Sequence, residues 1–436
     1  MVLLLLKLTL SPTARDLDRA LEAAYKSLYQ VLEASSAEGR LLVRVYPNLD
    51  PIVAGVIVAT RALRAGVRVS FKTSLEPPLE IREPSVLVGY SKLDYSAQNV
   101  TKPMIAIASG SIDSIPVHGA TFVGGQGSNT AVAALIATSG VFSAGTDIVS
   151  LALLGVYSGS YVDPVGRFAG LDRVLVDRLS ASAPSLDVIT TIKVYKPHLF
   201  DVCEAISRTA HPLYLGLAGN PWRCQEILGV EKYRSVAGKP LSSITDLKEV
   251  ERLARLVLDY MHSSFKSRIS AKDIVAGIMV SKSRESIVQD YREASDAVVY
   301  VSDAEKSLAR AVATLLDYSI ELPLAESRLE LHAKSLSDAV IGGSIARLGG
   351  PQGPKVYLVS AKPEVSLTLL WRALKTHGLI EPDSILVVEE NGELSASPIQ
   401  IEEALGYGAL RELARAGLVS FDGDRAWVER KALGAR

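Results

Sequence analysis

Residues Tyr46 to Asp50 form a junction that could carry chemistry, because an apolar run ends there and a helical segment begins. The run 41–45 precedes Tyr46, and residues rich in alanine and valine follow Asp50. In open α/β sheets, ligands bind where strands end and helices begin. A hydrolytic metal site would fill such an edge with carboxylates and imidazoles. This junction instead offers Tyr46, Asn48 and the single carboxylate of Asp50.

Asp50 has two interpretations, as a metal ligand at a strand end or as the cap of the helix that follows it. Pro51 comes directly after it. Proline is favoured at the first helical position, where its missing N–H costs nothing. One carboxylate alone holds a divalent cation poorly. We therefore expect Asp50 to cap its own helix.

The other predicted strand ends also lack typical metal ligands. The residues that follow the apolar runs 85–88 and 104–107 are Gly89, Tyr90, Ala108, Ser109 and Gly110. The six histidines are scattered without close His/Asp spacing, and no Ser/His/Asp or Cys/His arrangement stands out. A two-metal hydrolase needs several converging carboxylates and imidazoles. The sequence therefore predicts neither a metal site nor a cofactor.

The glycine-rich stretch 124–127 follows a predicted strand and opens a predicted helix at Ser128. Backbone N–H groups at such a helix start can bind phosphate, which makes Gly125, Gly127 and Ser128 candidate contacts for a phosphate or a nucleic acid. The stretch has no lysine as in a Walker A loop and does not fit Gly-x-Gly-x-x-Gly. A tight turn with Ser128 as the helix cap is the favoured interpretation.

The composition limits the class of protein. A chain of 436 residues, 48% of them hydrophobic, can build two or three domains with large cores. The formal net charge of −1 means that a nucleic-acid contact must come from a local basic patch. Cys203 and Cys224 are too few for a disulfide framework, so a reducing, cytoplasmic setting is expected. Residues 2–10 read as a strand, and no segment is apolar and long enough to span a membrane.

Alternating strand and helix signals predict an α/β fold with an N-terminal, mostly parallel sheet and helices on both faces. The predicted strands of this part are 41–46, 67–72, 85–88, 104–108 and 121–123, and its predicted helices are 11–37, 51–65, 128–138 and 147–158. Further along, the predicted elements are helices 247–261 and 274–283, strand 297–301, helix 304–316 and strand 355–360.

These elements group into four predicted domains. They are an α/β domain at 1–165, a helical connector at 166–290, a second, smaller α/β domain at 291–396 and a small tail at 397–436. Two helices and a hairpin around Asp422-Gly423-Asp424 give the tail a winged-helix-like pattern. One hypothesis is therefore a nucleic-acid-binding regulator that uses this tail.

The order of these elements resembles the DHH phosphoesterase superfamily, in particular its RecJ-like branch. The junction 46–51 resembles that family's His-x-Asp-x-Asp-Gly motif, and 86–90 resembles its second motif, a strand that ends in Asp. Residues 105–110 stand where a strand would end in Asp-His-His, and 151–159 resemble the helix that supplies the last Asp. The ligand positions implied by the resemblance are Tyr46, Asn48, Asp50, Gly89 or Tyr90, Ala108, Ser109, Gly110, and Ser158 or Gly159. Only Asp50 keeps the residue type of a ligand.

The lost ligands make the chain similar to the catalytically degenerate branch of the family, the one typified by cell-division-control protein 45 and its archaeal counterparts. That resemblance implies a non-catalytic replication factor, a scaffold in the archaeal GINS and MCM helicase complex that guides single-stranded DNA. The alternative is an enzyme, a divergent metal-dependent DHH phosphoesterase or single-strand exonuclease. Its relocated ligands would be Asp50, Asp94, Asp113 and Asp163.

Overall fold

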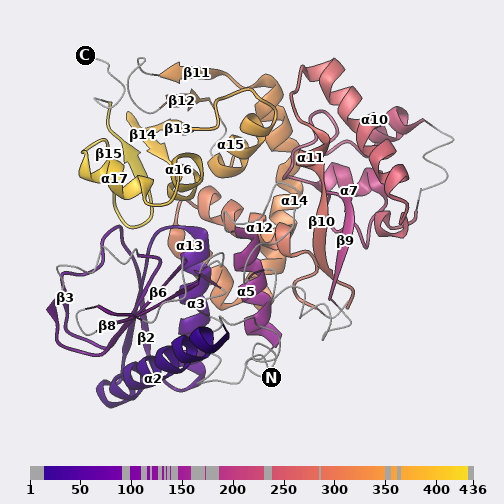
Figure 1. Cartoon of the computed structure of the whole chain (residues 1–436). Helices are drawn as coiled ribbons and strands as arrows, with labels where there is room; N and C mark the ends of the chain where they lie inside the picture. The colour runs from indigo at the N-terminus through magenta and orange to yellow at the C-terminus, as the bar shows by residue number, and fades with distance from the viewer. Residues whose placement is uncertain are drawn as a thin grey trace. The chain divides into compact units, whose positions relative to one another are not determined.

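The computed structural model divides into two compact units (Figure 1). The first contains Met1–Val162 and Phe168–Ser182, and the second contains Asp163–Arg167 and Ala183–Arg436. The residues that the structure describes are 14–90, 99–109, 115–117, 120–125, 130–131, 134, 138, 146–158, 172, 186–229, 238–283, 286–348, 355–360 and 365–430. The strand predicted at 2–10 lies outside them.

A six-stranded sheet forms the centre of the first unit, in the order β2-β1-β4-β6-β8-β7. Its strands are β1 (Leu41–Val45), β2 (Val69–Thr73), β4 (Ser85–Val88), β6 (Met104–Ser109), β7 (Ile115–Val117) and β8 (Ala120–Gly125). All neighbours pair in parallel except β7, which is antiparallel to β8 at the edge. The short strands β3 (Glu80–Ile81) and β5 (Asn99–Val100) form a separate parallel pair. The predicted α/β fold with a mostly parallel sheet is confirmed.

Helices α2 (Ala14–Glu38), α3 (Leu49–Arg64) and α5 (Thr146–Ser158) accompany this sheet. Helix α3 packs on β1, β2 and β4 and also contacts α5, whereas α2 contacts β1, β6 and β8. Asn48 is the N-cap of α3, and the first two turns of the helix are fully buried. The helix therefore begins directly at the carboxyl end of β1, where it fixes the position of Asp50.

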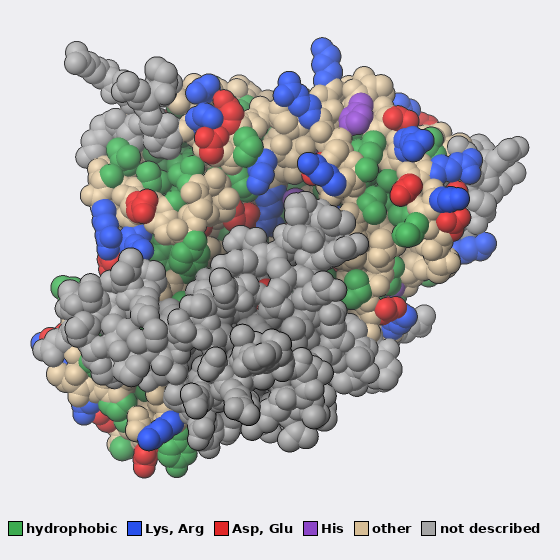
Figure 2. Space-filling view, in the orientation of Figure 1, with side chains coloured by type: hydrophobic (Ala, Val, Ile, Leu, Met, Phe, Trp, Pro, Cys, Tyr) green, Lys and Arg blue, Asp and Glu red, His purple; other side chains and the backbone are tan. Residues whose placement is uncertain are grey.

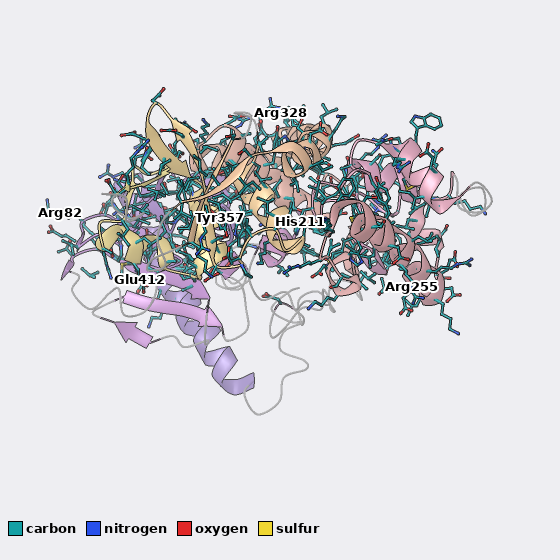
Figure 3. All side chains as sticks on the ribbon, turned by 90° about the horizontal axis from the view of Figure 1, so that it is seen from above. Arg82, His211, Arg255, Arg328, Tyr357 and Glu412 are labelled. Carbon is teal, nitrogen blue, oxygen red and sulfur yellow. A yellow bond between two sulfur atoms is a disulfide. The ribbon has the colours of Figure 1, made fainter. Side chains whose placement is uncertain are left out.

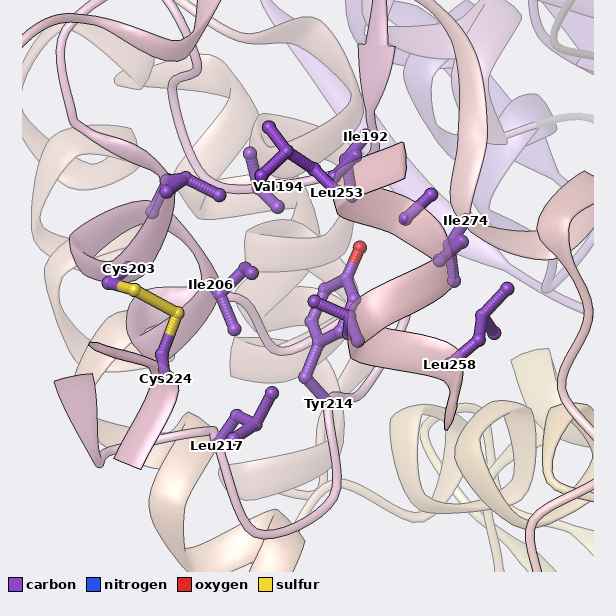
Figure 4. Close-up of a cluster of buried hydrophobic side chains, with 14 of the residues drawn as sticks. Ile192, Val194, Cys203, Ile206, Tyr214, Leu217, Cys224, Leu253, Leu258 and Ile274 are labelled. Atoms are coloured by element: carbon purple, nitrogen blue, oxygen red, sulfur yellow. A yellow bond between two sulfur atoms is a disulfide. The ribbon is translucent and has the colours of Figure 1, made fainter. Parts of the chain in front are cut away.

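The second unit begins with a two-stranded antiparallel sheet of β9 (Leu186–Ile192) and β10 (Val275–Ser281). Its helices here are α7 (Val202–Arg208), α8 (Pro221–Leu228), α10 (Leu247–Phe265) and α11 (Ala271–Ile274), with a 3-10 turn η2 (Leu241–Ser243). They share one apolar core, drawn in Figure 4. The helix predicted at 274–283 is wrong, because this short apolar run pairs along its whole length with β9. Periodicity alone does not separate a buried strand from a buried helix in so short a run.

Cys203 and Cys224 form a disulfide that joins α7 to α8 (Figure 4). Nothing in the sequence pattern links these two cysteines to each other. They are 21 positions apart in the sequence, but the packing of α7 on α8 brings their Cα atoms to 5.4 Å. That distance lies within the range that a disulfide requires.

Three consecutive helices follow, α12 (Tyr291–Ala304), α13 (Leu308–Leu316) and α14 (Tyr318–Gly342). The strand predicted at 297–301 is wrong, because these residues lie inside α12, and the helix predicted from 304 begins only at Leu308. The valines of 297–301 are buried against α13, α14 and α15 (Leu367–Thr376). Residues 297–301 form a continuous apolar run like that of a buried strand because all of them are buried within the helix.

A second six-stranded sheet completes this unit, in the order β11-β12-β13-β14-β16-β15. Its strands are β11 (Ile345–Leu348), β12 (Lys355–Val359), β13 (Ser384–Glu390), β14 (Glu393–Ala396), β15 (Val419–Phe421) and β16 (Ala426–Val428), with helices α16 (Pro398–Leu405) and α17 (Ala409–Arg415). Strand β16 pairs with β14, so the hairpin of the predicted tail extends the sheet of the preceding segment. The boundary placed at 396 falls inside this sheet, and the four domain limits stay predictions. Among the described residues, no helix has the length and apolarity needed to cross a bilayer.

Candidate functional site

The ends of β1, β4 and β6 lie side by side at one edge of the first sheet. Val45 pairs with Val88, and Val88 pairs with Ile107. Beyond them, the N–H of Tyr46 donates to the carbonyl oxygen of Val88 at 2.9 Å, and the N–H of Gly89 donates to that of Ile107 at 2.7 Å. The predicted ligand positions on three separate strands therefore meet at the carboxyl edge, where an α/β sheet binds ligands.

Apolar and aromatic groups fill this edge. The rings of Tyr46 and Tyr90 stand edge to face, with centroids 6.0 Å apart and planes at 84°. Both side chains are 1% exposed. They belong to one buried cluster, called here the strand-end cluster, whose members are Tyr46, Ile81, Leu87, Tyr90, Met104, Ala106 and Ala108. Three of the positions where the resemblance implies metal ligands are thus part of a hydrophobic core.

The Tyr90 hydroxyl has its hydrogen bonds within the chain. It donates to the backbone carbonyl oxygen of Ser74 at 2.9 Å and lies 2.9 Å from the hydroxyl of the same residue. The N–H of Ser74 in turn donates to the carbonyl oxygen of Val45, so this contact ties the turn after β2 to the end of β1. A buried tyrosine hydroxyl usually finds such a partner. Tyr90 therefore acts here as a packing and bridging residue.

Gly89 and Asn48 have structural roles in the backbone, one in a turn and the other as a helix cap. Gly89 has a φ of +83°, a left-handed conformation that side chains disfavour, and it turns the chain after β4. Asn48 accepts a hydrogen bond from the N–H of Leu49 at 2.6 Å and caps α3. The turn and the cap account for these two residues without a ligand.

Asp50 is buried and holds two N–H groups of a distant segment. Its Oδ2 accepts from the N–H of Thr130 at 2.7 Å, and its Oδ1 accepts from the N–H of Ala131 at 2.9 Å. Thr130 and Ala131 are both helical. The prediction that Asp50 caps its own helix is therefore wrong, because Asn48 caps α3 and Asp50 binds the segment 80 residues further along the chain.

Burial raises the pKa of the Asp50 carboxyl group. Desolvation raises the pKa of its carboxyl group from 3.8 to about 6, against the two backbone hydrogen bonds, which lower the pKa. The carboxylate accepts hydrogen bonds from N–H groups shortly after the glycine-rich stretch, whose residues Gly125, Gly127 and Ser128 are the candidate phosphate contacts. Gly125 ends β8, and Gly127 and Ser128 lie outside the described residues. The phosphate contacts stay a prediction.

Gly155 of α5 lies close to Asp50 and to the segment that Asp50 binds. A Cβ atom placed on Gly155 would lie 2.2 Å from the Cβ of Ala131, 3.2 Å from a methyl of Val53 and 3.6 Å from Oδ1 of Asp50. Real Cβ atoms do not come that close to another carbon. The absence of a side chain at Gly155 therefore lets α5 approach both α3 and the segment that Asp50 holds.

Several predicted positions lie at the limits of the described residues. Ser109 ends β6 and Ser158 ends α5. Outside the described residues lie Gly110, Gly159, Asp94, Asp113 and Asp163. Within the part of the chain that the structure describes, no three histidine, cysteine, aspartate or glutamate side chains come together as a metal site. The absence of a metal and the relocated-ligand alternative both stay predictions.

Sequence reasoning missed two contacts at this edge. The pairing of Tyr46 with Tyr90 follows from the register of β1 against β4, since both residues come directly after parallel strands. Their shared position at strand ends is the signal that could have revealed it. The contact of Asp50 with Thr130 had no such signal, because Pro51 makes a local cap equally reasonable.

The comparisons with known proteins now define the fold. Neither a family model nor a curated protein matches the sequence. The α/β fold of the structure is nevertheless similar to that of CDC45. Its likeness to the crystal structure of CDC45 from Entamoeba histolytica has a TM-score of 0.56 and covers 94% of this chain and 96% of that one, at 9% identity.

RecJ bound to Mn²⁺ from Thermus thermophilus is also similar, at 13% identity, with a TM-score of 0.37 and coverage of 94% of this chain and 53% of that one. The likeness to CDC45 establishes the fold alone, because the identity is low. The predicted resemblance to a CDC45-like protein is confirmed at the level of the fold.

Proposed function

We propose that the chain is a non-catalytic, RecJ-like replication factor of the CDC45 type. In this proposal it is a cytoplasmic scaffold in an archaeal helicase assembly with GINS and MCM subunits, and it guides single-stranded DNA. The observation that carries the proposal is the strand-end cluster: the fold is kept, while Tyr46, Tyr90 and Ala108 occupy ligand positions as buried core residues.

The chemistry of these residues favours a scaffold over a hydrolase. Divalent cations that assist hydrolysis need several oxygen or nitrogen ligands in one place. Tyr46 and Tyr90 present ring edges and faces to each other, and the Tyr90 hydroxyl is bonded to Ser74. Both oxygens of Asp50 accept N–H groups at helix-capping distances. A cation bound at this edge would disrupt the packing of Tyr46 against Tyr90. It would also compete with the hydrogen bonds that Asp50 accepts from Thr130 and Ala131.

A reconstitution tests the partners. The purified full chain is mixed with GINS and MCM from the same source, and complexes are separated by size-exclusion chromatography. We expect the chain to co-elute with both, and to do so equally well when Asp50 is replaced by Asn, since the proposal gives Asp50 no role in chemistry. Failure to bind either partner at micromolar concentrations would contradict the scaffold role.

Binding of single-stranded DNA is measured separately, by fluorescence anisotropy over a range of salt concentrations. On the face shown in Figure 2, Lys and Arg side chains are interspersed with Asp and Glu rather than gathered by sign. Because the formal net charge of the chain is −1, we expect weak binding with a shallow salt dependence, corresponding to few phosphate contacts. A complete lack of binding at low salt would remove the guiding of DNA from the proposal and leave the partner interactions to be judged on their own.

A further inference from the structure

A cavity in the second unit lies beside the β15–β16 hairpin, between the end of α12 and the starts of α15 and α16. Its volume is about 120 Å³. An engineered protein cavity of about 150 Å³ holds benzene, whereas drug-sized ligands need pockets of roughly 300 Å³ or more. Glu412, labelled in Figure 3, lies on α17, the helix that leads into the hairpin. The cavity therefore has room for a side chain or a small organic ion, but not for a nucleotide.

The lining of the cavity is partly apolar and partly polar. Val365, Leu367 and Val388 supply alkyl surface. Ser395 and Ser397 line the cavity as well, and both residues are buried. A ligand with a short alkyl chain and one polar end would match both parts of this lining.

Asp303 brings a negative charge to the polar part of the lining. Its Oδ2 accepts hydrogen bonds from the hydroxyl of Ser366 and from the N–H of Thr368, each at 2.7 Å. The hydroxyl of Ser397 also bonds to this carboxylate. All of these donors are neutral, and no lysine or arginine among the described residues forms a salt bridge with Asp303. Its charge therefore lacks a counter-ion at the cavity, and a buried charge without a counter-ion is costly.

The cations near Asp303 are already paired with other carboxylates. Glu390 accepts a salt bridge from Nζ of Lys306 through Oε1, and its Oε2 lies 3.1 Å from Nη1 of Arg425. Arg372 forms salt bridges with Asp296 and Glu403. The charged residues of the lining are Asp303, Lys306, Glu389, Glu390, Asp424 and Arg425, four carboxylates and two cations with a formal sum of −2. Arg430, outside the lining, pairs with Glu389, which leaves a charge of −1 for a ligand to balance.

We propose that this cavity binds a primary alkylammonium group, with Asp303 as its counter-ion. The ammonium group donates hydrogen bonds to Asp303 and to a serine hydroxyl, while the alkyl chain lies against Val365 and Leu367. An anion would meet a negatively charged lining. A divalent metal ion fits less well, because no three metal-ligating side chains come together in the described part of the chain. One monovalent cation balances the charge of −1.

Calorimetric titration of the full chain tests the site, with n-butylammonium as the probe and n-butanol as its neutral counterpart. We expect the wild type to bind n-butylammonium in the millimolar range, as is reasonable for so small a ligand, and not to bind n-butanol. Asp303→Asn should bind n-butylammonium at least about tenfold more weakly. The control Asp338→Asn, at an exposed side chain outside the cavity, should bind like the wild type.

Val388→Phe is a second variant, which fills the cavity and leaves Asp303 and its hydrogen bonds in place. It should also lose binding, and it keeps the proposal testable where Asp303→Asn fails to fold. A wild type that does not bind n-butylammonium, or that binds n-butanol equally well, would overturn the proposal. Unchanged affinity in folded Asp303→Asn or Val388→Phe would do the same.

Two larger probes distinguish the source of the ammonium group. N-acetyl-lysine methylamide stands for the lysine side chain of a protein, and putrescine stands for a free diamine. Because the cavity balances one positive charge and its lining already holds Lys306 and Arg425, a second ammonium group would be repelled. We therefore expect the lysine derivative to bind more tightly than putrescine. Tighter binding of putrescine would assign the site to free amines instead, and failure of both probes to bind would contradict an alkylammonium site.

Discussion

The buried carboxyl group of Asp50 leads to a specific prediction about stability and pH. In the folded chain, burial raises its pKa from 3.8 to about 6. A group whose pKa is raised on folding stabilises the folded state fully at pH values below its unfolded pKa, and this contribution is lost as the pH rises through the folded pKa. Asp50 should therefore destabilise the fold progressively between about pH 4 and pH 7.

The size of the effect follows from the shift. A difference of about 2.2 pKa units, between 3.8 and about 6, corresponds to about 3 kcal/mol at 1.36 kcal/mol per unit. About 2 kcal/mol of this falls between pH 4.5 and pH 7.5. Asp50→Asn removes the titration and keeps one hydrogen-bond acceptor for the N–H groups of Thr130 and Ala131. The free energy of unfolding of the wild type should thus fall, relative to Asp50→Asn, by about 2 kcal/mol between these two pH values.

The measurement is urea unfolding of both proteins at pH 4.5, 6 and 7.5. Other buried acids, such as Asp296, are common to the two proteins, so their titration cancels in the difference. Asp259→Asn is the control, because this side chain is exposed, and it should follow the wild type at every pH. A difference between the wild type and Asp50→Asn that stays constant with pH, or that changes in the opposite direction, would refute the burial of an ionisable Asp50 next to Thr130.

Three further predictions concern packing and covalent structure. Gly155→Ala should lower the free energy of unfolding by about 1–3 kcal/mol in urea titrations, because the new Cβ would collide with Ala131; unchanged stability would contradict the close approach. Tyr90→Phe should cost about 1 kcal/mol through its lost hydrogen bond, and a neutral result in the same titration would argue against that bond. Replacing Cys203 and Cys224 by serine should cost about 3 kcal/mol, whereas equal stability of the oxidised wild type and the double variant would argue against the disulfide.

The sequence was sufficient for the parallel sheet and for the place of the candidate site. Apolar runs at 41–45, 85–88 and 104–107 alternate with helical segments, and a parallel sheet brings the ends of such strands to one edge. The prediction that this edge lacks metal ligands rests on its side-chain types, Tyr46 and Tyr90 above all. Residue types and the succession of strands and helices along the sequence are local properties, and they can be recognised without knowing any long-range contact.

The predictions from the sequence were wrong or incomplete where a contact between residues distant in the chain determines the local structure. The segment 275–281 is a strand because β9 pairs with it, and 297–301 is a buried part of α12, a helix that contacts α13, α14 and α15. Asp50 binds Thr130 rather than its own helix start, and Cys203 meets Cys224 only through the packing of two helices. In each case the local pattern fits two structures, and tertiary packing selects one of them.

We propose that no catalytic cation binds at the strand-end cluster, because Tyr46, Tyr90 and Ala108 fill the ligand positions there as core residues. The most direct test of this proposal is the hydrolysis of labelled single-stranded DNA by the purified full chain in the presence of Mn²⁺, with Asp50→Ala as the parallel sample. We expect both proteins to leave the DNA intact at every manganese concentration. Manganese-dependent cleavage of the DNA by the wild type would contradict this expectation.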